Sequence, residues 1–208
     1  MNMKKHYKIL LAIVVLITGC TKDFLKINND PNFPTSAPLS QLLSSVEVDL
    51  ARGLNIRYGL SNFAAVYMHQ ITMREDPDNY GITGSSYYTN NPWLLLYAYP
   101  FQDIDLIIKT GDANGDLVYS GIAKILKAYS FSLLVDVYGD VPFSEANRQP
   151  EGINYPKYDQ GATIYPQLFA LLDEGISNIN DADATNMFVP GDDDFIYGGD
   201  VDKWLRLV

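Results

Sequence analysis

The side chain with the most distinctive chemistry is the thiol of Cys20, the only cysteine in the sequence. It follows a cationic segment with Lys4, Lys5 and Lys8, an apolar run over residues 9–17 and a Thr-Gly pair. This order is typical of an export signal. As a helix the apolar run reaches only about 14 Å, whereas a bilayer core is about 30 Å thick, so we do not expect it to span a membrane.

The four residues Ile17-Thr18-Gly19-Cys20 resemble the lipobox of bacterial lipoproteins, in which the cysteine is acylated and becomes the mature N-terminus. The alternative is an ordinary secretory signal with a coincidental cysteine. We expect a signal peptide at 1–19, lipidation at Cys20 and an Asn- and Pro-rich extended tether at 20–38. A single cysteine cannot form an internal disulfide, so the fold must be held by its core.

Two carboxylates, Asp140 and Glu145, suggest a competing enzymatic hypothesis. A glycoside hydrolase uses such a pair as acid and as nucleophile or base. These two residues lie close together on one predicted turn, whereas the reaction needs a deep cleft between them. We therefore assign no catalytic residue, and we keep a lipid-anchored glycoside hydrolase as the alternative function.

Metal-binding patterns are weak. Asp192, Asp193 and Asp194, with Asp200 and Asp202 nearby, could chelate calcium, but their spacing matches no EF-hand and an exposed acidic loop is the alternative. His69 lacks a second histidine or a cysteine that could complete a metal site. The sequence predicts no metal and no cofactor.

The charge balance excludes some partners. With 15 basic and 25 acidic residues the chain has a net charge of −10, and loss of the signal lysines makes it more acidic. Such a surface repels nucleic acid and anionic lipid headgroups. The 15 tyrosines and 9 phenylalanines suit a wet binding surface, although many must fill the core.

Hydrophobic periodicity is helical nearly throughout, and it predicts an all-α domain over 39–208. Helices are expected over 39–50 with a cap from Ser36 or Ser40, over 60–72, over 93–108 with a break at Pro100, over 118–137 and over 164–179. Residues 74–91 and 181–200 are expected to be loops. A further helix starts after Asp200 and stops after about two turns, which suggests the N-terminal part of a larger protein.

The stretch over residues 128–146 resembles a hallmark of the SusD/RagB family of outer-membrane nutrient-binding lipoproteins. The matching motif residues are Asp136, Tyr138, Gly139, Asp140 and Pro142. The lipobox with residues 21–25, the tether tract over 29–32 and the run over 200–207 resemble the same family in the same order. The sequence departs from the family in two respects. Family members are about twice this length or more, and Pro100 stands where the resemblance implies an uninterrupted helix.

The resemblance implies a tetratricopeptide-like helical superhelix with long inserted loops, truncated here. It also implies a surface-exposed, lipid-anchored protein of the outer membrane. Such a protein binds an oligosaccharide or peptide and passes it to a SusC-like TonB-dependent transporter. A tetratricopeptide adaptor without a small ligand is a further alternative.

The motif also has a purely local explanation. Gly139 can end a helix at positive φ, Asp140 can bind neighbouring backbone, and Pro142 forbids helix continuation. Asp136, Tyr138 and Asp140 are then residues of a helix stop, and a ligand role for the turn is the alternative.

Sugar recognition in water needs aromatic faces beside hydrogen-bonding side chains, and one short segment offers both. We expect Tyr80, Tyr87 and Tyr88 to form a contact platform and Asn90 and Asn91 to donate hydrogen bonds. The alternative is that the two asparagines cap the next helix and Trp93 anchors it in the core.

Overall fold

The computed structural model describes residues 37–56, 59–72 and 87–208. The predicted signal peptide, Cys20, nearly all of the tether and Tyr80 lie outside the described residues. The folded unit runs from Pro38 to Val208.

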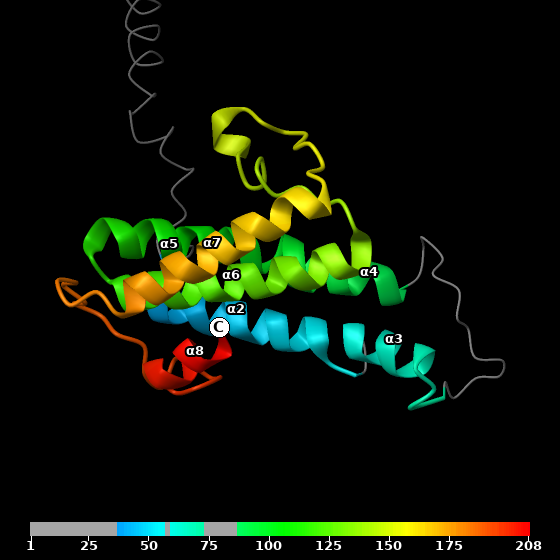
Figure 1. Cartoon of the computed structure of the whole chain (residues 1–208), viewed down its shortest axis with the longest axis horizontal. Helices are drawn as coiled ribbons and strands as arrows, with labels where there is room; N and C mark the ends of the chain where they lie inside the picture. Colours follow the sequence, from blue (N-terminus) through cyan, green and yellow to red (C-terminus); the bar gives the residue numbers. More distant parts are fainter. Residues whose placement is uncertain (1–36, 57–58, 73–86) are drawn as a thin grey trace, which may run out of the picture. The chain divides into compact units, whose positions relative to one another are not determined.

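The described residues are organised as helices (Figure 1). In chain order they are α2 (Leu39–Leu54), α3 (Leu60–Tyr67), α4 (Tyr87–Trp93), the π-helix η2 (Leu94–Ala98), α5 (Pro100–Asn114), α6 (Leu117–Tyr138), the 3-10 helix η3 (Gln149–Glu151), α7 (Gly161–Ile179) and α8 (Val201–Leu207). Within these ranges the β-structure is one isolated antiparallel bridge between Val141 and Asp159. The all-α prediction is confirmed, while the tetratricopeptide-like repeat remains an expectation from the resemblance.

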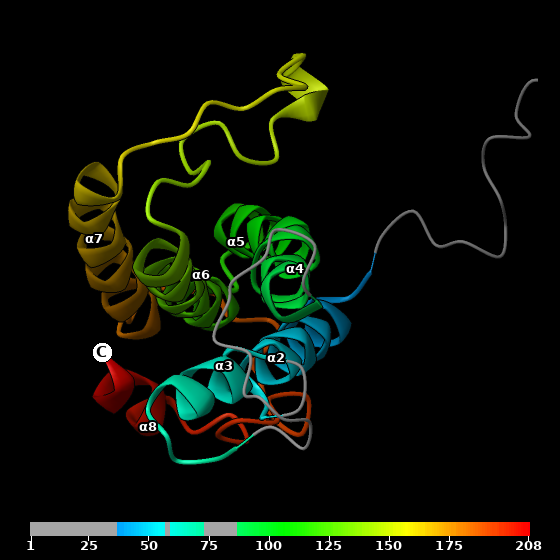
Figure 2. The same cartoon turned by 90° about the vertical axis from the view of Figure 1, so that its right-hand side faces the viewer.

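Helix α6 is the centre of the packing. It lies between α5 and α7, and α2 packs against α5 (Figure 2). Its buried side chains include Ile122, Phe131 and Leu134. Among the described helices it is long and apolar enough to cross a membrane, but 78% of its apolar window is buried inside the unit, as in the core helix of a folded domain.

Several predicted helix ends need correction. Helix α2 begins after Pro38 without a side-chain cap, so the expected cap from Ser40 is wrong, and Ser36 lies outside the described residues. Helix α3 ends at Tyr67 rather than Thr72, because His69 takes a positive φ of 54° that interrupts helical geometry.

The segment before α5 differs more. The loop expected to reach Asn91 ends earlier, since α4 already begins at Tyr87. The turn-forming residues Asn90 and Asn91 suggested a loop. Instead α4 runs directly into η2, whose side chains Leu95 and Leu96 are buried in the core. The break expected at Pro100 is confirmed, because this proline is the first residue of α5. At that position an N–H group has no partner within the helix, so the missing N–H of proline costs no hydrogen bond.

Helices α6 and α7 cross so closely that two glycines are required. A Cβ on Gly121 would lie 2.8 Å from the carbonyl oxygen of Gly175 and 2.7 Å from Cγ1 of Ile179. We expect Gly121→Ala to lower the free energy of unfolding by about 1–3 kcal/mol, measured by chemical denaturation. Gly191→Ala is the control, since nothing lies within 4 Å of its added Cβ. Equal stability of the two variants would contradict this close crossing.

Candidate ligand-binding site

The loop over residues 139–160, which we call the motif loop, connects α6 to α7 and begins at the predicted helix stop. Gly139 has φ 77°, and its N–H donates to the carbonyl of Val135 at 2.8 Å. A side chain at this φ would be strained. Pro142 is buried just beyond, so the motif ends α6 and turns the chain.

The other motif residues join α6 to α7. Asp140 Oδ1 accepts a hydrogen bond from the N–H of Gly161, the first residue of α7, at 3.1 Å. Asp136 Oδ1 accepts from the hydroxyl of Tyr165 on α7 at 2.5 Å. Burial raises the pKa of Tyr138 to about 12, so its phenol keeps its proton. These contacts fit the explanation by helix termination.

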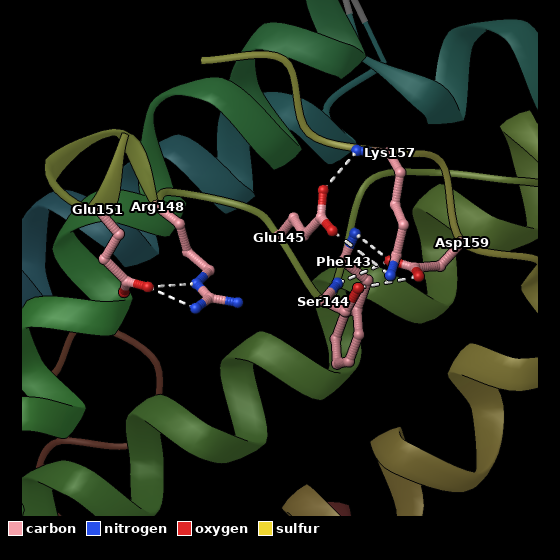
Figure 3. A network of polar contacts seen from close by, with 7 residues as sticks. All are labelled: Phe143, Ser144, Glu145, Arg148, Glu151, Lys157 and Asp159. Atoms are coloured by element: carbon pink, nitrogen blue, oxygen red, sulfur yellow. Dashed lines mark hydrogen bonds and ion pairs between the residues drawn. The ribbon is translucent and has the colours of Figure 1, made fainter. Parts of the chain in front are cut away.

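Asp159 holds the two arms of the motif loop together (Figure 3). Its Oδ2 accepts from the N–H groups of Phe143 at 3.0 Å and Ser144 at 2.7 Å, and its Oδ1 accepts from the Ser144 hydroxyl at 2.9 Å. Its backbone pairs with Val141 at 3.0 and 3.2 Å. Burial alone would raise the pKa of Asp159, but the hydrogen bonds from Ser144 and Phe143 outweigh it and lower that pKa.

The charged side chains of the motif loop are largely paired with one another. Glu145 accepts from the backbone N–H of Lys157 at 3.0 Å and pairs with its ammonium at 3.4 Å. Arg148 pairs with Glu151 (Figure 3). The N–H of Lys157 is the main cause of the lowered pKa of Glu145. A carboxyl group with a lowered pKa is a poor general acid, so in the hydrolase hypothesis Glu145 could serve only as the base or nucleophile.

A cluster of aromatic rings in stacked and edge-to-face contact connects the motif loop to α4, η2, α5 and α6. We call it the aromatic cluster; its members are Trp93, Tyr97, Phe101, Phe131, Tyr138 and Phe143. The ring of Trp93 stacks on Tyr97 at 4.6 Å and meets Tyr138 edge-on at 5.2 Å. Phe143 of the loop meets Phe131 of α6 at 4.6 Å. Trp93 is thus a packing residue, as the alternative for this position proposed.

Tyr97 lies in η2, the π-helix at the centre of this cluster. π-Helical turns occur frequently at functional sites. Burial raises the pKa of Tyr97 to about 12, with smaller contributions from Tyr158, Asp105 and Asp159. Trp93 of α4 and Phe143 of the motif loop belong to this one cluster, so α4 and the start of the motif loop meet at the same end of the helices.

The family model for SusD-like proteins, described as starch-binding and associating with the outer membrane, matches residues 31–208. The chain belongs to the SusD-like family. A solved structure named as a chitin-binding protein is similar in fold, with a TM-score of 0.64 and 25% sequence identity. The match covers 82% of this chain and 36% of that chain, so the SusD-like chain spans about a third of this relative. No curated protein is significantly similar in sequence.

The structure describes only some of the predicted ligand residues of this SusD-like protein. Tyr87 and Tyr88 occupy the first turn of α4 rather than a loop. Asn90 is exposed and Asn91 is partly exposed on the same helix, one turn or less from Trp93. Because Trp93 contacts Tyr138, this helix lies next to the family motif.

Sequence reasoning missed two exposed aromatic residues in the SusD-like motif loop. The side chain of Tyr155 is 94% exposed and that of Tyr158 is 67% exposed. The sequence feature that could have identified them is Tyr-Pro-Lys-Tyr over residues 155–158. A tyrosine in an irregular segment does not belong to the buried face of a helix, so its ring can remain exposed.

The acidic segment before α8 needs a correction as well. Asp194 is buried at 2% exposure rather than lying on an exposed acidic loop. Its two oxygens accept from the N–H groups of Ile196, Tyr197 and Gly199 and from the Trp204 indole at 2.7 Å. A carboxylate that accepts four N–H hydrogen bonds stabilises the loop before α8 and has little capacity left to bind a metal ion. Within the described residues no group of three or more acidic, histidine or cysteine side chains could hold a metal ion.

An apolar groove of about 220 Å³ lies between α6, α7 and the end of α8. Tyr129, Tyr165 and Phe169 contribute rings, and the rest of its lining is mainly aliphatic. The groove offers few hydrogen-bonding groups, so it suits a hydroxyl-rich ligand less well than the region around α4 does.

Proposed function

We propose that this SusD-like protein is a lipid-anchored outer-membrane protein that binds a glycan outside the cell. In this proposal it passes the glycan to a SusC-like TonB-dependent transporter. The observation that carries the proposal is the match to a family described as starch-binding and associating with the outer membrane. Similarity to a protein named as chitin-binding favours a glycan over a peptide. Acylation of Cys20 would supply the anchor.

The proposed ligand contacts are Tyr80, Tyr87, Tyr88, Asn90 and Asn91. Tyrosine rings can cover the C–H faces of sugar rings while their hydroxyls remain in water. Amide side chains can both donate to and accept from sugar hydroxyls. The exposure of Asn90 and the position of α4 beside the motif loop support this assignment.

The double substitution Tyr87→Ala and Tyr88→Ala in the full-length protein tests the proposal. An aromatic contact contributes about 0.5–1.5 kcal/mol, so loss of two rings should weaken binding about fivefold to a hundredfold. We would first find a ligand on a glycan array and then measure its affinity by isothermal titration calorimetry. Tyr129→Ala, in the apolar groove, is the matched control and should bind like the wild type.

Unchanged affinity in the double variant would exclude this site assignment. Cleavage of the bound oligosaccharide during incubation would instead support the hydrolase alternative. Co-purification with a barrel protein, without affinity for any glycan on the array, would support the adaptor alternative.

A further inference from the structure

We infer that Tyr155 and Tyr158 form a second carbohydrate-contact surface on the motif loop, suited to a neutral oligosaccharide. This inference rests on the proposed function. It adds contacts that are separate in sequence from Tyr80, Tyr87, Tyr88, Asn90 and Asn91.

The exposure of the two rings is the first observation. The motif loop contains three aromatic residues, and one of them, Phe143, packs against Phe131 of α6. Tyr155 and Tyr158 remain 94% and 67% exposed, and the loop that bears them extends away from the helices (yellow in Figures 1 and 2). The core therefore gains little from either ring.

The rigidity of the backbone beneath the rings is the second observation. The N–H of Lys157 donates to Glu145, and the N–H of Asp159 donates to Val141 at 3.0 Å, so both chain neighbours of Tyr158 are anchored. Pro156 restricts the backbone between the two tyrosines. A surface whose backbone is already ordered loses less conformational entropy when a ligand binds.

The charges of the loop indicate the class of ligand. Glu145 pairs with Lys157, and Arg148 pairs with Glu151. With these ions already paired, the motif loop offers a ligand mainly rings, phenol hydroxyls and the exposed side chain of Asn154. These groups match the C–H faces and hydroxyls of a neutral sugar.

The size of the surface argues against a protein partner. A tyrosine side chain buries about 150–250 Å² at most, so the two rings fall well short of the roughly 800 Å² that each partner contributes to a stable protein interface. The motif loop joins the aromatic cluster through Phe143, and α4 joins the same cluster through Trp93, so the loop that bears the surface is rooted beside α4. One oligosaccharide chain long enough to extend between them could contact both sets of residues.

The test is calorimetric titration of the full-length protein with chitohexaose and, separately, maltoheptaose. The double variant Tyr155→Ala, Tyr158→Ala should bind the active probe about fivefold to a hundredfold more weakly. Tyr155→Phe with Tyr158→Phe should keep most of the affinity, because the rings remain. Tyr129→Ala is the control, and thermal unfolding should be unchanged in the double alanine variant because both side chains are exposed.

Each other outcome has a distinct meaning. If the wild type binds a probe and the double alanine variant binds it equally well, the inference is overturned while the proposed function stands. If that variant keeps its glycan affinity but loses a co-purifying barrel protein, the loop docks a protein and the inference is also overturned. If the wild type binds neither probe nor any arrayed glycan, the proposed function fails and the inference fails with it.

Discussion

Substitution of Asp194 by alanine should lower the free energy of unfolding by about 3–5 kcal/mol. The change removes the acceptor of four N–H groups in a site that is only 2% exposed. Each buried donor left without a partner costs about 1–3 kcal/mol, and rearrangement of the loop before α8 should recover part of this loss. Chemical denaturation followed by tryptophan fluorescence measures the effect, because the indole of Trp204 donates to Asp194 at 2.7 Å.

The matched control is Asp192→Ala, two residues away in the same acidic run. Asp192 is exposed, and exposed substitutions usually change stability by less than about 0.5 kcal/mol. If the two alanine variants lost the same stability, the role of Asp194 as the organiser of this loop would be refuted.

Raising the pH from about 5 to 8 should destabilise the protein through Glu47. This residue is 2% exposed on α2. Burial, followed by the interaction with Asp194, raises its pKa from 4.5 to about 8. Between these values the folded protein keeps a proton that the unfolded chain has released. Stability therefore falls by up to about 1.4 kcal/mol per pH unit and levels off above pH 8.

Geometry supports a protonated Glu47. Its Oε2 accepts from the N–H of Phe195 at 2.6 Å, whereas no described N–H or O–H group donates to its buried Oε1. A hydrogen bond shared with the Asp194 carboxyl also raises the pKa of Glu47. An ionised carboxylate in this position would face the charge of Asp194. Hydrogen bonds from Tyr197, Trp204 and Gly199 outweigh burial and lower the pKa of Asp194, so Asp194 is the ionised member of the pair.

The variant Glu47→Gln isolates this effect because its side chain is neutral at every pH and similar in shape. Its unfolding free energy should vary much less between pH 5 and 8 than that of the wild type, measured by denaturation at fixed pH values. Carboxylates with lowered pKa values, such as Asp159 and Asp194, titrate below this window and do not interfere. Parallel pH profiles of variant and wild type would show that Glu47 is ionised in the folded state.

The sequence determined the features that depend on neighbours along the chain. Gly139 ends α6 because glycine tolerates positive φ and Pro142 follows it. Pro100 begins α5 because a proline at the first helical position forfeits no hydrogen bond. Asp200 caps α8 by accepting from the N–H of Lys203. The all-α class followed from the same local periodicity, and the family motif was recognisable for the same reason.

Tertiary structure alone decided which polar residues are buried and which aromatic residues stay in water. Glu47 falls on the apolar face of its helix, four residues after Leu43 and three before Leu50, yet its partner Asp194 lies 147 positions further along the sequence. Asp159 ties its arm of the motif loop to Val141 and Ser144. Phe143 packs that loop on α6, whereas Tyr155 and Tyr158 stay exposed. Burial and exposure of this kind depend on contacts between distant segments, which local propensity and spacing do not encode.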